Sequence, residues 1–151
     1  MKKTVYFVLA LLVMSLVFVS CKKDVDENAN YELLTASDLN DSWLAGTWSG
    51  TEENIFEGDK DLMLKYAPTT PETALTSYTL PINSVKLSAS ELKELLTTLN
   101  ATWPNNGLTM VSTITIKANS SRTTLIREIT QTVTDNGKSC RHIEKCTYNK
   151  N

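Results

Sequence analysis

The chain has 151 residues, with 15 basic and 17 acidic side chains, and 41% of its residues are hydrophobic. Once an N-terminal targeting segment is removed, about 130 residues would remain, enough for one domain and too few for two. Without Lys2 and Lys3, 13 basic residues stand against 17 acidic ones. This mildly acidic balance argues against a nucleic-acid partner, which would need a basic face.

The first two dozen residues have the pattern of a secretory signal peptide. Lys2 and Lys3 precede an apolar run from Val5 to Val19, and Ser20 and Cys21 follow it. A basic start, a short apolar core and a small residue before the cut are typical of such signals. The run is about 15 residues long, whereas a membrane span needs roughly 20. A secreted protein cut elsewhere and an uncleaved single-pass anchor remain as alternatives.

The segment Phe18-Val19-Ser20-Cys21 resembles the lipobox of bacterial lipoproteins, with Phe18 where Leu is usual, and the junction Ser-Cys-Lys-Lys-Asp resembles those of Bacteroidetes lipoproteins. The resemblance implies that the Cys21 thiol receives a diacylglycerol and that cleavage precedes this residue. It also implies acylation of the new amine, and two or more acyl chains give stable membrane attachment. We therefore expect a lipid-anchored protein of the cell envelope, at the periplasmic or surface face of the outer membrane, with the membrane as a partner.

The resulting division of the chain has three parts. Residues 1–20 are the expected signal peptide, and residues 21–36 the lipidated Cys and a flexible tether. Residues 22–30 are charged and nearly devoid of apolar side chains, so they cannot bury enough surface to fold. Residues 37–151 are expected to form a single β-rich domain, because threonine is frequent and Val and Ile are concentrated in the second half.

The domain opens with a short helix expected near Ser37 to Trp43, followed by Gly46-Thr47-Trp48-Ser49-Gly50, which leads into a strand. The Gly-x-Trp pattern resembles the start of the first strand in lipocalins and related calycin barrels. The resemblance implies that Trp48 plugs the closed end of a barrel, and it makes Trp48 a candidate ligand-binding residue. The alternative is a Trp that packs on the core of an unrelated β-sheet.

The next stretch predicts two short strands. Glu57 to Lys60 is typical of a turn, and Leu62, Leu64 and Tyr66 alternate as in a strand. Residues 67–71 contain two prolines and form a loop. Residues 75–80 favour a strand, and Pro81 places it at an edge of the sheet or ends it.

A helix is predicted after Leu87. Ser88 is its expected N-cap, Glu91 completes a capping box, and Leu87 and Leu92 occupy the positions of a hydrophobic staple. Leucines recur at helical spacing at 92, 95, 96 and 99 and form one face of the helix. This face either packs into the core or binds a partner. Asn100 and a turn over 104–107 close the helix. A helix at this point does not fit a lipocalin.

Three strands complete the prediction: Leu108 to Lys117, Thr123 to Thr134 and Ser139 to Tyr148. Asn136-Gly137 predicts a two-residue type I′ hairpin, which fixes the pairing of the last two strands. The expected partners are Asp135 with Lys138, Val133 with Cys140, Thr132 with Arg141, Gln131 with His142, Ile129 with Glu144, Glu128 with Lys145, Arg127 with Cys146 and Leu125 with Tyr148.

One face of this hairpin mixes apolar residues with four polar ones: Arg127, Gln131, His142 and Glu144. If the face looks inward, these are candidate ligand-binding residues, because ligand cavities combine apolar walls with a few convergent polar groups. If they lie at a solvated margin of the sheet, Arg127 and Glu144 form a diagonal ion pair and bind nothing.

Neither catalysis nor a metal is expected. Cys140 and Cys146 are too far apart on one strand to form a disulfide, and with His142 they do not match zinc spacing patterns. Catalytic motifs and phosphate-binding loops are also missing. We therefore expect an α+β protein of mostly antiparallel sheet with one packed amphipathic helix, and an open calycin-like barrel is one form that this sheet can take. The expected function is non-catalytic, cofactor-free binding of a small apolar ligand, as in lipocalins. The alternative is a protein-interaction or inhibitor module that contacts another envelope protein.

Overall fold

The computed structural model describes residues 30–66, 75–105 and 108–151. Its elements follow the order β1 (Tyr31–Leu33), α2 (Asp41–Leu44), β2 (Trp48–Gly58), α3 (Lys60–Tyr66), β3 (Tyr78–Val85), α4 (Ala89–Thr98), β4 (Ala101–Asn105), β5 (Leu108–Asn119), β6 (Thr124–Asp135) and β7 (Lys138–Lys150). None of the helices within these ranges has the length and apolar character needed to span a bilayer. The expected lipidation site, Cys21, lies outside the described residues.

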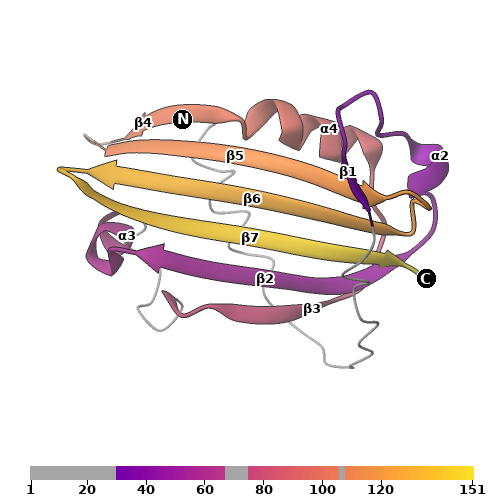
Figure 1. The fold of residues 1–151 in the computed structure, drawn as a ribbon, viewed down its shortest axis with the longest axis horizontal. Coiled ribbons are helices and arrows are strands. Elements are labelled where there is room, and N and C mark those ends of the chain that lie inside the picture. Colours follow the sequence, from indigo (N-terminus) through magenta and orange to yellow (C-terminus); the bar gives the residue numbers. More distant parts are fainter. Residues whose placement is uncertain (1–29, 67–74, 106–107) are drawn as a thin grey trace.

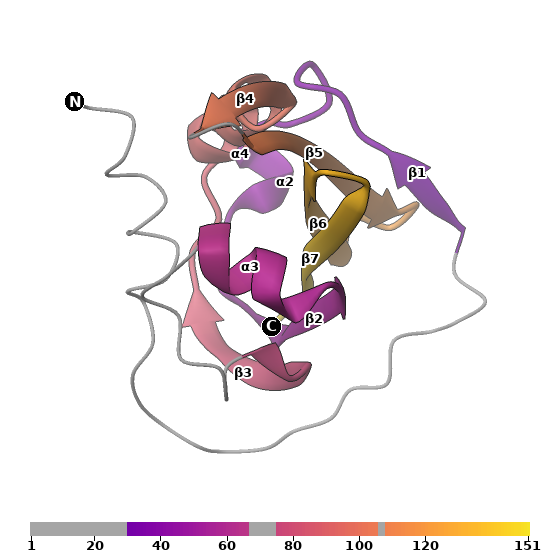
Figure 2. The same cartoon turned by 90° about the vertical axis from the view of Figure 1, so that its left-hand side faces the viewer.

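All strands belong to one antiparallel sheet with the order β1-β5-β6-β7-β2-β3 (Figure 1). Strand β4 pairs with the same edge of β5 as β1 does, farther along that strand. The sheet curls strongly but does not close, since β3 pairs only with β2 (Figure 2). An α+β fold with an open, barrel-like sheet is thereby confirmed.

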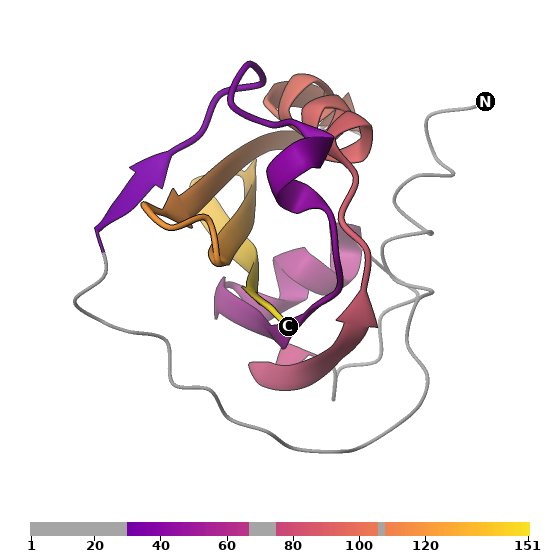
Figure 3. The ribbon, with the colours of Figure 1, turned by 90° about the vertical axis from the view of Figure 1, so that its right-hand side faces the viewer.

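Short helices cover the two ends of the curled sheet. Figure 2 looks along the strands from the end that carries α3, and Figure 3 looks from the opposite end, where α2 lies. We call the face that they cover the inner face. It carries two apolar clusters. Cluster 1 joins α2, α4 and the sheet, and cluster 2 joins α3, Leu75 and the sheet.

The last three strands agree with the sequence prediction. All eight expected β6–β7 pairs are present. Asn136 and Gly137 have φ angles of 49° and 78°, as a type I′ turn requires. The predicted helix is also present as α4. The Ser88 hydroxyl accepts a hydrogen bond from the Glu91 N–H at 3.4 Å, and the leucine stripe packs into cluster 1.

The predicted strand over Leu62 to Tyr66 is wrong, because this segment is helix α3. Gly58 turns the chain with a φ of 89°, and the Asp59 carboxylate accepts a hydrogen bond from the Leu62 N–H at 2.9 Å. Asp59 therefore caps a helix. The neighbouring Leu62 and Met63 are both buried, as a helix permits and a strand on one face does not.

Four predicted boundaries also differ from the structure. The expected tether reaches residue 36, yet Tyr31–Leu33 already pairs with β5. The helix expected over 37–43 is only α2, after a turn in which the Asp38 carboxylate accepts from the Thr35 N–H at 2.8 Å. Strand β3 runs through Pro81, which is tolerated because β3 is an edge strand. The turn predicted over 104–107 is wrong for Pro104 and Asn105, because Ala101–Asn105 forms β4, and its residues 106–107 lie outside the described ranges.

Candidate functional site

Seven polar side chains form a band across the inner face, between the two apolar clusters. The strand register aligns them: on β7, His142 and Glu144 lie between Cys140 of cluster 2 and Cys146 of cluster 1. We call this set the polar band; its members are Glu52, Asn54, Ser112, Arg127, Gln131, His142 and Glu144. A buried polar group costs free energy unless it is hydrogen-bonded, so the partners of each member matter.

Arg127 and Glu144 form an ion pair within the band. Both side chains are 18% exposed, and a second contact joins the Arg127 guanidinium to the Cys146 sulfur at 3.1 Å. The predicted pairing of Arg127 with Glu144 is therefore confirmed, with both side chains largely withdrawn from solvent. Arg127 Nε is buried and has no hydrogen-bond partner among the described residues.

Burial by itself lowers the pKa of Arg127, but the neighbouring Tyr148, Cys146 and Glu144 outweigh it and raise that pKa, so the guanidinium stays charged. Burial raises the pKa of Cys146 to about 11, which keeps this thiol protonated at neutral pH. Cys140 and Cys146 are both buried free thiols. The prediction that they lie apart on one strand is confirmed.

A chain of hydrogen bonds links His142, Asn54 and Glu52. The His142 Nε2 and Asn54 Oδ1 atoms are 2.8 Å apart, and Asn54 Nδ2 donates to the Glu52 carboxylate at 2.7 Å. Since the carboxylate can only accept, the Asn54 amide is oriented with its oxygen toward His142, and His142 Nε2 must carry the proton. The Phe56 ring stacks on the His142 ring with centroids 4.5 Å apart. Burial lowers the pKa of His142, although Glu52 opposes this, so the imidazole is neutral at pH 7.

Ser112 and Gln131 complete the band on β5 and β6. Ser112 is 1% exposed, and its hydroxyl has no hydrogen-bond partner within the described part of the chain. Gln131 is its direct cross-strand neighbour and is half-buried. Buried polar groups are normally paired, so this corner of the band has unused hydrogen-bonding capacity.

Trp48 lies apart from the band, at the α2 end of the sheet. It is fully buried, and its indole N–H donates to the Leu44 carbonyl at 2.9 Å. The Trp43 ring meets it edge-on, and the Lys150 ammonium lies 5.6 Å from the centroid of its ring. The closed barrel end expected around Trp48 is absent from the described part of the chain, because the sheet does not close. The indole instead packs in cluster 1 and is occupied by contacts within the protein. Of the five candidate ligand-binding residues, the structure thus groups Arg127, Gln131, His142 and Glu144.

Ligand atoms of Glu52, Glu144 and Cys146 lie within 4.8 Å of one another. These residue types can hold a metal, but the Arg127 guanidinium already contacts Glu144 and Cys146 and supplies the local positive charge. Cys140, Cys146 and His142, whose spacing does not match zinc patterns, are not the group that these ligand atoms form.

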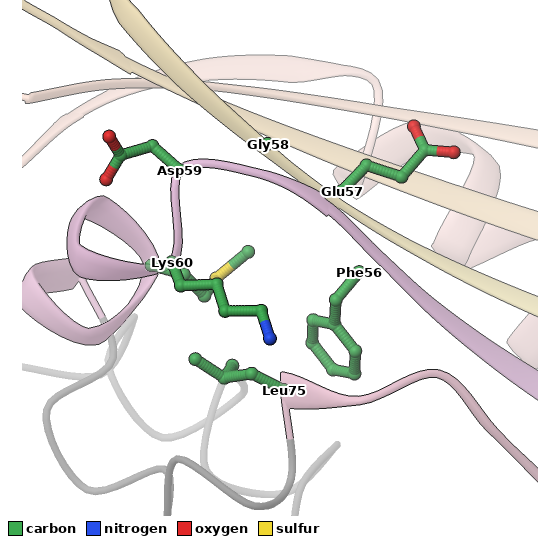
Figure 4. Close-up of a pocket in the computed structure, with 7 residues that line it drawn as sticks. Phe56, Glu57, Gly58, Asp59, Lys60 and Leu75 are labelled. Carbon is green, nitrogen blue, oxygen red and sulfur yellow. The ribbon is translucent and has the colours of Figure 1, made fainter.

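The two best-defined hollows among the described residues are not lined by Arg127, Gln131 or His142. One, of about 20 Å³, lies between α3 and the end of β2. Figure 4 shows Phe56 and Leu75 beside it, with the carboxyl groups of Glu57 and Asp59 pointing away. It has room for about one water molecule. The other is an open groove of about 370 Å³ beside β4 and β5, a size that suits a small ligand. Its lining residues are Asn100, Ala101, Thr102, Val111, Ser112 and Thr113.

Sequence reasoning missed Glu52, Asn54 and Ser112. Each lies on a strand whose pairing with β6 or β7 is fixed by long-range contacts, so the local pattern does not bring them to His142. In the comparisons with known proteins, no family model matches the chain, and neither does any curated protein or solved structure.

Proposed function

We propose that this chain is a lipid-anchored cell-envelope protein whose domain binds a small, largely apolar ligand on its inner face without catalysing a reaction, in the manner of lipocalins. The observation that carries the proposal is the polar band between two apolar clusters. Ligand sites combine mostly apolar walls with a few placed polar groups, and the inner face has this composition.

Partial burial of the band supports binding over a purely structural role. Gln131 and His142 are half-buried, and the Ser112 hydroxyl has no hydrogen-bond partner among the described residues. A band that only held the fold together would be expected to satisfy its own polar groups. A ligand that brings the missing partners would offset this cost. Inner-face binding predicts a closed cavity of at least a few hundred Å³ lined by Arg127, Gln131 and His142. Neither hollow described above is lined by these residues, so a ligand would have to open this space.

Binding is tested with N-phenyl-1-naphthylamine, a neutral dye that fluoresces in apolar surroundings, and the full-length Cys21→Ser chain. We expect saturable fluorescence with the parent chain and at least about tenfold weaker binding with Gln131→Phe, which fills the middle of the band. Thr130→Phe is the matched control, because Thr130 is the next residue and faces the other side of the sheet. Equal binding by both variants would place the dye elsewhere and refute inner-face binding.

The anchor rests on Lys2, Lys3, the apolar run and the Ser20-Cys21 junction. It is tested by labelling growing cells with radioactive palmitate. We expect label on the parent chain and on Cys140→Ser, and none on Cys21→Ser. Label that persists on Cys21→Ser would show that another group is acylated.

An interaction module is the second candidate function, and Val111 favours it. This side chain is 42% exposed and lines the open groove. Trp103, a large aromatic residue of the neighbouring strand β4, gives less support, because it is half-buried and packs against cluster 2. If a partner protein binds at the groove, a photo-crosslinker at position 111 should capture one defined protein in intact cells. The same crosslinker at position 128 should not, and equal capture from both positions would remove this candidate.

A further inference from the structure

We infer that the ligand of the inner face is uncharged and carries a hydroxyl or amide group on an apolar body, and that Ser112, Gln131 and His142 recognise this group. The inference rests on the proposed binding function and adds the chemical class of the ligand. It follows from three features: the alignment of these side chains, their unused hydrogen-bonding atoms and the charge of the inner face.

The three residues form one straight row across β5, β6 and β7. Ser112 is the cross-strand partner of Gln131, and Gln131 is the partner of His142. Directly opposed residues on one face of an antiparallel sheet have Cβ atoms about 4.5–5.5 Å apart. One small polar group can therefore reach two of the three side chains at once.

Each member of the row has hydrogen-bonding atoms that the described residues leave unused. The Ser112 hydroxyl has no partner there, and Gln131 makes no side-chain hydrogen bond within that part of the chain. His142 donates through Nε2 to Asn54, which leaves Nδ1 of the neutral ring as an acceptor. The row thus offers donors and acceptors together, as a hydroxyl or amide group requires, and all of its members are neutral.

Charge on the inner face disfavours an ionic ligand. Within the polar band, Arg127 is the one permanent cation, and it is paired with Glu144, while Glu52 adds a second carboxylate. An anion would approach a surplus of negative charge. The same surplus would attract a cation, but its source, Glu52, lies opposite Cys146, four residues along β7 from His142. At the row itself, a cation would lose its hydration and would meet no opposite charge.

The flanks of the row explain why the rest of the ligand should be apolar. Met110 and Val133 of cluster 2 lie on one side of the row, and Ile114 and Ile129 lie on the other. Each pair is one step along β5 and β6 from Ser112 and Gln131 on the same face, because side chains of a strand return to that face every second residue. A ligand that lies along the strands would place its polar group at the row and its apolar ends over these residues.

The test displaces bound N-phenyl-1-naphthylamine from the full-length Cys21→Ser chain with octan-1-ol, octanoate and octylammonium at neutral pH. These three compounds share a chain length and differ in the charge of the polar group. We expect octan-1-ol to act at concentrations at least about tenfold lower than either ion. Octanoate or octylammonium acting as well as octan-1-ol would overturn the inference while leaving the proposed binding function intact. Absence of dye binding would instead refute the binding function and the inference with it.

Ser112→Ala tests the row itself. Removing one hydroxyl partner should weaken displacement by octan-1-ol about 3- to 10-fold, as expected for one hydrogen bond. Thr115→Val is the control and should change nothing, because Thr115 lies on the outer face of the same strand and does not line the groove. Because the Ser112 hydroxyl lacks a partner in the described protein, Ser112→Ala should unfold at the same or a higher urea concentration than its parent. Unchanged displacement by octan-1-ol in a folded Ser112→Ala would overturn the assignment of the row.

Discussion

Replacement of Arg127 by Met should destabilise the protein far more than loss of an exposed ion pair. The Arg127–Glu144 pair is 18% exposed on both sides, and carboxylate oxygens of Glu52 and Glu144 lie within 4.8 Å of each other. Without the guanidinium, two neighbouring carboxylates remain in a largely buried place. Breaking a buried pair on one side costs about 3–5 kcal/mol, and partial exposure brings our expectation to the low end, about 3 kcal/mol.

Removal of both charges should restore most of that loss. Apolar side chains of similar size often replace a buried ion pair at no net cost, so Arg127→Met with Glu144→Leu should be more stable than Arg127→Met alone. The free energies of unfolding of the parent, both single variants and the double variant, measured in urea, form a double-mutant cycle. We expect a coupling energy of about 2 kcal/mol or more.

Arg141→Met is the matched control. Arg141 pairs with Glu57 on the outer face, where the side chains are 48% and 47% exposed, and such pairs contribute under about 1 kcal/mol. If Arg127→Met cost no more than Arg141→Met, the band would be as well solvated as the outer surface. The solvated-margin interpretation of the hairpin face would then be correct.

The lowered pKa of His142 makes a pH dependence testable. The unfolded chain binds this proton near the ordinary pKa of 6.5, and the folded chain binds it only at lower pH. Stability from this residue is therefore complete above about pH 6.5 and falls as the pH drops through it, so His142→Gln should lose less stability than its parent between pH 7 and 5, by urea unfolding. Parallel losses would show that His142 is not the cause. Cys140 and Cys146 should resist iodoacetamide in the folded protein and should both react in urea, because burial raises the pKa of each thiol; mass spectrometry counts the adducts, and fast labelling of the folded chain would contradict the burial. Gly50→Ala should destabilise by more than about 1–3 kcal/mol, because its Cβ would lie 1.7 Å from the Thr147 carbonyl oxygen; an unchanged urea midpoint would mean that β2 and β7 can separate at this point.

Local chemistry explains why part of the fold could be predicted. The turn at Asn136-Gly137 determines its own geometry, and the period of two then determines the β6–β7 register up to Tyr148. Helix α4 could also be predicted from the sequence, because its cap and its leucine stripe lie within a dozen residues. The sequence does not predict helix α3, because the alternation of Leu62, Leu64 and Tyr66 also fits a strand. In the structure, the cap from Asp59 stabilises a helix instead.

The candidate site could also be predicted only in part from the sequence. Arg127, Gln131, His142 and Glu144 share one hairpin, so their common face followed from the turn. Asn54 is 88 residues from His142 in the chain, and no local pattern on β2 predicts the hydrogen bond between these two side chains. The orientation of the imidazole, the stacking of Phe56 and the unpaired Ser112 hydroxyl depend on such long-range pairing and needed the structure.

The short strand β1 has a consequence for how the domain would respond to tension from the proposed anchor. Only three residues pair with β5, Leu33 is 63% exposed, and firm burial starts at Leu34. Tension applied from the N-terminal side would break the hydrogen bonds between β1 and β5 one after another, before the force reached the apolar core. Peeling of β1 would lengthen the tether by about 10 Å at roughly 3.4 Å per residue. If the anchor and the binding face proposed above are correct, the domain would yield slightly to force while that face stayed folded.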